Sequence, residues 1–228
     1  MEDSFSQRSP QRDDSSSGIL TRTIGEVWLD VAAMILKEGK PATYDGLEIR
    51  ELIMTTLKVS NPRSQDPLID RFADPARLQW MHTNFTEPAP VRELGDADSY
   101  ATRLYNYEHR GINQIEWVID RLQQDRSSRS ATITTFQPLS DTTYIPCVSL
   151  LDFFVQNEAL NLITYAHSID FGTKGFANLV ELAFVQEQVA KALAIEIGSL
   201  TFIVKSAHVY ETDAEAMGGV LWSARNVR

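Results

Sequence analysis

Cys147 is the residue of this chain best suited to nucleophilic chemistry. A thiolate attacks electron-poor carbon once nearby positive charge has lowered the pKa of its thiol. Cys147 is the only cysteine among 228 residues, and it follows Pro146 at the start of an apolar run. A lone cysteine in such a run can equally be a buried core residue. The residues that accompany it must decide between these two interpretations.

Polar residues at three other places could form the walls of a site around this cysteine. Ser168 and Asp170 stand at the end of a second apolar run, and Asn178 follows in the first turn of an expected helix. His208 and Tyr210 are two positions apart in a strand-like segment, so their side chains point to one face. Such a pair is typical of a pocket wall, although a strand of the core could also carry it.

The expected secondary structure places these residues in a few elements. The segments 144–155 and 160–170 are β-patterned and are joined by three polar residues, which predicts a β-hairpin. The segment 178–193 is apolar on nearly every side at first, which predicts a buried central helix. Residues 200–210 predict the strand that closes the pattern.

The rest of the chain is expected to support these elements. Thr23 and Glu26 have capping-box spacing, and an apolar stripe at helical spacing follows up to Gly39. The further elements expected are a strand over 49–59, a short helix over 75–81, a helix over 113–124 and a strand over 131–136. Residues 1–20 are polar, which predicts a disordered tail before one domain over 21–228.

Composition limits the classes of function. The chain has 43% hydrophobic residues, enough for a substantial core, and a formal net charge of −10. That charge argues against a nucleic-acid-binding protein, which needs dense lysine and arginine. No apolar run reaches the roughly 18 residues of a membrane span, and no signal peptide is evident, so we expect a cytoplasmic protein without membrane contact. A single cysteine excludes an internal disulfide and a cysteine-rich metal site, and we expect no metal.

The order of these residues resembles the thymidylate synthase and pyrimidine nucleotide hydroxymethylase family. There a Pro-Cys pair supplies the nucleophile, an Arg-Ser-x-Asp run binds phosphate and folate, and an asparagine reads the pyrimidine. The resemblance covers roughly residues 23–213. It implies a single α+β domain with a mixed sheet flanked by helices. It also implies that two copies of the chain form a homodimer. It also implies 5,10-methylenetetrahydrofolate as cosubstrate.

The resemblance assigns a role to each matching residue. Cys147 would add to C6 of the pyrimidine ring, and Tyr100, in a segment similar to Tyr-Gly-x-x-x-Arg, would line the pocket beside the thiolate. A half-buried strand tyrosine fits Tyr100 about as well. The remaining roles implied are phosphate binding by Arg129, His167 and Ser168, folate binding by Asp170, uracil recognition by Asn178, and sugar contacts by His208 and Tyr210. Arg129 would act across the dimer interface, but an ordinary turn arginine is the alternative.

The chain departs from the family at several places. The catalytic glutamate expected three residues before Trp80 is Arg77, and the acids that could replace it are Asp74, Glu87 and Glu93. His167 replaces the arginine that binds phosphate and keeps the cysteine ionised; as a protonated imidazole it could replace that arginine in part. Ser130 replaces a second arginine of the turn at Arg129, and Lys174 is a candidate for a compensating cation. Arg22 could reach a phosphate, although a free surface arginine fits it better. The expected C-terminal closure over folate is short or absent.

Two classes of function therefore stay open. The first is an enzyme that transfers a one-carbon unit to C5 of a uracil-type nucleotide and leaves it as a methyl or hydroxymethyl group. The second is a catalytically impaired paralogue that binds a nucleotide or a partner protein. Cys147 and Asn178 favour the enzyme, whereas Arg77 and His167 favour the binding protein.

Overall fold

The computed structural model describes residues 19–21, 23–142 and 144–226. Seven strands of these ranges form one mixed sheet in the order β1-β3-β9-β8-β7-β6, with β2 paired to β3. Its strands are β1 (Ile19–Thr21), β2 (Lys40–Tyr44), β3 (Leu47–Val59), β6 (Ala131–Thr134), β7 (Val148–Gln156), β8 (Ala159–Asp170) and β9 (Glu196–Tyr210). The pairs β8–β9 and β1–β3 are parallel and the others are antiparallel, so the expected mixed sheet is confirmed.

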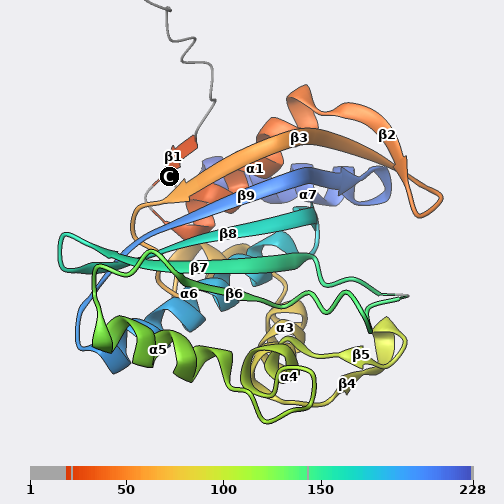
Figure 1. Cartoon of the computed structure of the whole chain (residues 1–228). Coiled ribbons are helices and arrows are strands. Elements are labelled where there is room, and N and C mark those ends of the chain that lie inside the picture. The colour runs from red at the N-terminus through yellow and green to blue at the C-terminus, as the bar shows by residue number, and fades with distance from the viewer. Residues whose placement is uncertain (1–18, 22, 143, 227–228) are drawn as a thin grey trace, which may run out of the picture.

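Helices cover one face of this sheet, and the face turned toward the viewer in Figure 1 carries none of α1, α6 and α7. The helices are α1 (Ile24–Glu38), α2 (Pro67–Phe72), α3 (Pro75–Thr86), α4 (Tyr100–Tyr105), α5 (Gln114–Gln124), α6 (Gly175–Leu193) and α7 (Glu211–Arg225). A short hairpin of β4 (Pro90–Val91) and β5 (Ala97–Asp98), with the 3-10 turn η1 (Arg92–Leu94) between them, lies beside α3 and α4. The α+β class is therefore confirmed.

The buried central helix expected from the sequence is α6. Most of its residues are buried, and it packs against α1, α3, α5, β8 and β9. Trp28 of α1 packs on Phe176 with ring centroids 4.9 Å apart and donates its indole N–H to the backbone oxygen of Phe171 at 2.9 Å. The predicted capping box of Thr23 and Glu26 fixes the start of α1. The contacts of Trp28 then hold α1 against α6 and against the loop before α6.

The β7–β8 hairpin has a tighter turn than expected. Only Asn157 and Glu158 connect the strands, and both have positive φ angles, 53° and 57°. Two left-handed residues in a row form the turn that matches the twist of a two-residue hairpin. The prediction of three connecting residues was therefore wrong, because Gln156 continues the ladder by pairing with Ala159.

Strand pairing brings the chemistry-bearing residues to one end of the sheet. In the β7–β8 ladder Val148 pairs with Ala166, and the N–H of His167 donates to the oxygen of Cys147 at 3.1 Å. In the parallel β8–β9 ladder Asp170 pairs with His208. The carboxyl ends of β8 and β9 therefore meet the start of β7.

Several boundaries differ from the sequence predictions. Helix α3 continues five residues past the expected end at Met81, and β9 begins at Glu196 instead of Leu200. Tyr100 opens α4, so the strand interpretation of this tyrosine was wrong. Residues 19–21 form β1, while the rest of the expected tail and Arg22 lie outside the described residues, so those expectations stay predictions. In the part of the chain that is described, no helix is long and apolar enough to cross a membrane.

Candidate active site

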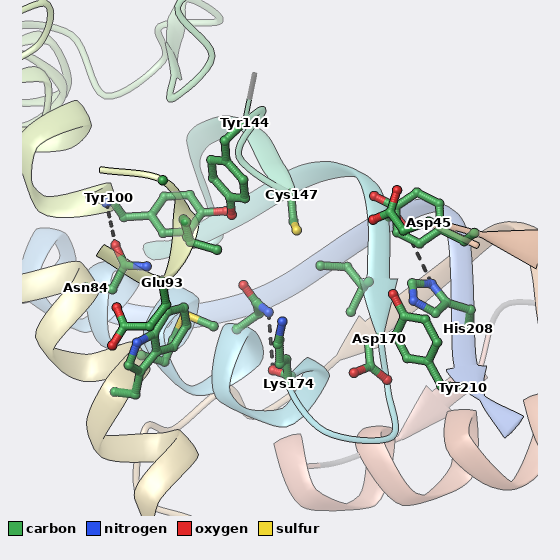
Figure 2. Close-up of a pocket in the computed structure, with 18 residues that line it drawn as sticks. Asp45, Asn84, Glu93, Tyr100, Tyr144, Cys147, Asp170, Lys174, His208 and Tyr210 are labelled. Carbon is green, nitrogen blue, oxygen red and sulfur yellow. Dashed lines mark hydrogen bonds between the residues drawn. The ribbon is translucent and has the colours of Figure 1, made fainter. Parts of the chain in front are cut away.

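A cavity of about 420 Å³ lies at the end of the sheet where β8 and β9 finish and β7 begins. Figure 2 shows its walls, which come from segments far apart in the sequence. The lining side chains that can form hydrogen bonds or carry charge belong to Tyr44, Asp45, Trp80, Asn84, Glu93, Tyr100, Tyr144, Cys147, Ser168, Asp170, Lys174, Asn178, His208 and Tyr210. Seven of the nine residues predicted for the site are therefore together.

The sulfur of Cys147 points into this cavity (Figure 2). The alternative interpretation, a cysteine sealed within the core, is therefore wrong. Burial raises the pKa of the thiol, while the Lys174 ammonium and a hydrogen bond with the Tyr144 hydroxyl act in the opposite direction. Burial is the largest of these influences, so the pKa of the thiol is raised overall in the isolated chain. Burial outweighs the cation, because a charged sulfur loses water contacts there.

Tyr100 holds the backbone next to the nucleophile. Its hydroxyl accepts a hydrogen bond from the N–H of Val148 at 2.9 Å, and its ring stacks on Phe85 with centroids 4.4 Å apart. Its own N–H donates to Oδ1 of Asn84 at 2.8 Å. Burial raises the pKa of Tyr100 well above its ordinary value, so its hydroxyl is a neutral phenol.

Asp170 ends β8 and Asn178 lies in the first turn of α6, on either side of the loop that joins them. The amide nitrogen of Asn178 donates to the backbone oxygen of Lys174 at 3.2 Å, which leaves the second N–H and Oδ1 for other partners. The carboxylate of Asp170 accepts from the N–H of Gly172 at 2.8 Å and from the hydroxyl of Thr173. Each carboxylate oxygen keeps further acceptor capacity.

His208, Tyr210 and Ser168 form one wall, and the strand pattern predicts that the first two share a face. The His208 and Tyr210 rings are perpendicular with centroids 5.1 Å apart, and Nδ1 of His208 lies 3.4 Å from the Ser168 hydroxyl. Tyr44 lies against the same imidazole, at 5.7 Å between centroids. Nε2 of His208 is buried and has no hydrogen-bond partner among the described residues. Burial lowers the pKa of His208 and, with the charge of Asp170, raises the pKa of Tyr210 to about 12.

Two predicted site residues lie outside this cavity. His167 is not among its lining residues, and burial together with the nearby Lys205 lowers its pKa, which favours a neutral imidazole over the protonated one considered from the sequence. Arg129 is exposed in the connection between α5 and β6. The next strand residue, Ala131, pairs with Phe153, which is six residues along the strand from Cys147, roughly 20 Å away.

The three acids considered as replacements for the family's glutamate have different surroundings. Asp74 caps α3 by accepting from the N–H of Ala76 at 2.8 Å and lines a separate cavity of about 250 Å³ together with Arg77. Glu87 is the exposed residue after α3 and lines neither cavity. Only Glu93, from η1, lines the cavity that contains Cys147.

The sequence alone did not point to several lining residues. Tyr44 and Asp45 come from the tip of the β2–β3 hairpin, where Asp45 and Gly46 have positive φ angles of 50° and 77°. The Asp-Gly pair signals a tight turn, but nothing in its local pattern says that the turn reaches His208. Asn84 and Tyr144 carried no signal that we could have used.

Comparisons with known proteins agree with this geometry. A family model described as thymidylate synthase matches residues 49–224. A Methanosarcina mazei protein named "Putative thymidylate synthase" is 31% identical over 211 residues, 89% of this chain and 94% of that protein. A protein of the same name from Methanothermobacter thermautotrophicus is 34% identical over 216 residues, with 87% and 96% covered. The deoxyuridylate hydroxymethyltransferase of Bacillus phage SP01 is 26% identical over 220 residues, with 82% and 57% covered. This chain therefore belongs to the thymidylate synthase family.

Proposed function

We propose that this chain transfers a one-carbon unit from 5,10-methylenetetrahydrofolate to C5 of a uracil-type nucleotide, through a covalent bond between Cys147 and C6. The observation that supports this proposal best is the shared cavity of Cys147, Asn178, Asp170 and the His208–Tyr210 pair. A nucleophile, an amide, a carboxylate and a polar wall are the groups that a pyrimidine nucleotide and a reduced folate together require.

In the proposed reaction, the Cys147 thiolate adds to C6 and the electrons of the C5–C6 double bond move toward C5. C5 then bonds to the carbon that the folate supplies at the oxidation level of formaldehyde, and C5 loses its proton. Glu93 is the carboxylate we propose as the acceptor of that proton, because it lines the cavity and both other candidate acids lie elsewhere. The bond between that carbon and the folate nitrogen would then break and leave an exocyclic methylene on C5. Hydride from the folate would convert this methylene to a methyl group, or water would convert it to a hydroxymethyl group, and the Cys147 sulfur would leave C6 as the C5–C6 double bond forms again.

Recognition of the base would rest on Asn178. One amide N–H already donates to the Lys174 oxygen, so the other can donate to O4 while Oδ1 accepts from N3–H of uracil. Cytosine presents an amino group and an unprotonated N3 at these places, which reverses both hydrogen bonds. The sugar would contact His208 and Tyr210, and Ser168 would face the phosphate.

The folate would be held by Asp170. Its carboxylate is oriented by Gly172 and Thr173, and its free acceptor positions suit the paired N–H donors of a pterin ring. The chemistry that the folate brings is the one-carbon unit itself. The chain's contribution is to orient it beside the pyrimidine.

A homodimer would complete the phosphate site. Arg129 is too far from the cavity of its own subunit, so we propose that Arg129 of the partner subunit binds the phosphate. The sheet also exposes apolar side chains that such an interface could cover: Ile53 and Met54 are each 62% exposed, and Leu150 is 36% exposed. His167 would contribute through its backbone bond to Cys147 rather than through an ionised side chain.

A second candidate function is nucleotide binding without turnover. The raised pKa of the Cys147 thiol and the position of Arg77 outside the cavity favour it. The two functions differ in whether a covalent bond forms with a pyrimidine.

A trapping experiment tests the proposal. The full chain is incubated with 5-fluorodeoxyuridylate and 5,10-methylenetetrahydrofolate and its intact mass is measured. We expect a ternary adduct with the wild type and none with Cys147→Ser, because fluorine at C5 cannot leave as a proton would. Absence of the adduct with several fluoropyrimidines, together with nucleotide-dependent thermal stabilisation, would establish the binding function instead.

A further inference from the structure

We infer that Lys174 is the positioning residue that stabilises the thiolate form of Cys147, a role that rests on the proposed function. Both side chains line the same cavity and point into it, from the start of β7 and from the loop before α6 (Figure 2). Among the residues that the structure describes, no other lysine and no arginine lines this cavity. The lining carboxylates are Asp45, Glu93 and Asp170.

Local structure does not account for a lysine at this position. Lys174 is the N-cap of α6, and its side chain makes no capping hydrogen bond. Serine, threonine, aspartate or asparagine is preferred at an N-cap, and a cation near the positive end of a helix is unfavourable. A residue that opposes its local preference in a cavity wall indicates a role in the site.

The backbone of Lys174 is held firmly. Its N–H donates to the oxygen of Asp170 at 3.1 Å, and its own oxygen accepts from the N–H of Asn178 at 3.1 Å and from that residue's amide at 3.2 Å. These hydrogen bonds to the end of β8 and to the first turn of α6 therefore fix where the lysine side chain starts, on the cavity side of the helix terminus.

The ammonium group is not neutralised by a neighbouring acid. Within the described part of the chain, no carboxylate lies within 4 Å of it. Asp170, the nearest acid along the chain, accepts hydrogen bonds from Gly172 and Thr173. The positive field of Lys174, added to that of the α6 terminus, therefore acts on an anion in the cavity.

The electrostatic consequence concerns the sulfur directly. Lys174 is the largest of the influences that lower the pKa of the Cys147 thiol, against the burial that raises it. Ionisation releases the thiol proton to solvent, and no proton or bond is transferred to the lysine. Removing the ammonium would leave only hydrogen bonds, such as the one with Tyr144, to oppose the burial, so the thiolate fraction at neutral pH would fall.

Alkylation kinetics test this inference without any substrate. Because the chain has one cysteine, the rate of reaction with iodoacetamide reports Cys147 alone. The rate is measured between pH 6 and 10 for the full-length wild type, Lys174→Met and Lys174→Arg. For Lys174→Met we expect a rate at pH 7 reduced about tenfold and a pH midpoint shifted upward. Lys174→Arg should keep the wild-type profile.

A matched control is Lys191→Met, which removes an exposed lysine from the last turn of the same helix. Its profile should equal that of the wild type. The inference is overturned if Lys174→Met leaves the profile unchanged or if Lys191→Met changes it equally. Lys174→Gln, with its polar end retained, replaces the methionine variant if that variant unfolds. If the alkylation profile of Lys174→Met is unchanged while the wild type is trapped by 5-fluorodeoxyuridylate, only the role of Lys174 is refuted. If the profile of Lys174→Met is shifted while the wild type is not trapped, only the transfer reaction is refuted.

Discussion

The hydroxyl of Tyr100 accepts a hydrogen bond from the N–H of Val148, the residue directly after Cys147, at 2.9 Å. This contact joins the first turn of α4 to the start of β7, 48 positions later in the chain. Because Val148 is fully buried, its N–H has no access to water as an alternative partner. The orientation of the nucleophile therefore depends on a tyrosine from another part of the fold.

Tyr100→Phe should destabilise the chain by about 1–3 kcal/mol, because it leaves the Val148 N–H unsatisfied. It should also slow alkylation of Cys147, whose backbone loses a constraint. Urea unfolding and iodoacetamide kinetics measure the two effects. Tyr105→Phe is the control, since the Tyr105 hydroxyl donates to Gln188 at an exposed position. Equal destabilisation by both variants would contradict the prediction.

Glu93→Gln should reduce turnover by roughly 10²–10⁴-fold, the usual size of a lost general base. Trapping by 5-fluorodeoxyuridylate should survive, because that adduct forms without loss of a proton from C5. Glu87→Gln removes an acid that does not line the cavity and should turn over normally. If the Glu93 variant keeps full turnover, another group takes the proton.

Asn178→Asp should shift binding from uracil toward cytosine nucleotides. A carboxylate cannot donate to O4 but accepts from the cytosine amino group. The lost bond costs uracil binding about 1–3 kcal/mol, or roughly 5–150-fold. Thermal shift with deoxyuridylate and deoxycytidylate measures the two affinities. Asn226→Asp, at the end of α7, should leave both unchanged. A variant that still prefers uracil would disprove base reading by Asn178.

The free energy of unfolding should decrease as the pH falls below about 6.5, the ordinary pKa of histidine. Burial lowers the pKa of His208 in the folded chain. As the pH falls, the unfolded chain therefore binds a proton at this histidine before the folded chain does, which stabilises the unfolded state relative to the folded state. The nearby groups Asp170, Glu51 and Lys174 modify this shift without reversing it. In His208→Gln the slope of unfolding free energy against pH should be smaller between pH 5 and 6.5. Identical slopes in urea unfolding at several pH values would show that His208 is not responsible.

Mixing inactive variants tests the shared site. Arg129→Ala and Cys147→Ser should each be inactive, but a mixed dimer contains one cavity with Cys147 and the intact Arg129 of the partner subunit. Random exchange at equal amounts should restore about one quarter of wild-type activity, since half of the dimers are mixed and each has one complete site. Activity absent after proven exchange, or a monomer by sedimentation at micromolar concentration, would argue against the interface.

Sequence patterns by themselves determined the elements whose signals are local. The capping box and apolar stripe predicted α1, the apolar run predicted the buried α6, and the spacing of His208 and Tyr210 predicted a shared strand face. These succeed because helix periodicity, strand alternation and capping depend on residues a few positions apart. The resemblance to the family then selected Cys147 and Asn178, and both line the cavity.

Tertiary structure alone decided which charges share the cavity. Glu93 lines it and Arg77 does not, although both lie near Trp80 in the sequence, because the direction of a helical side chain depends on how its helix packs. Lys174 comes to face Cys147 only because α6 begins where β8 ends beside β7. These residues are far apart in the sequence, and no local pattern predicts that they meet. The balance between burial and positive charge at the sulfur therefore arises only when the sheet is assembled.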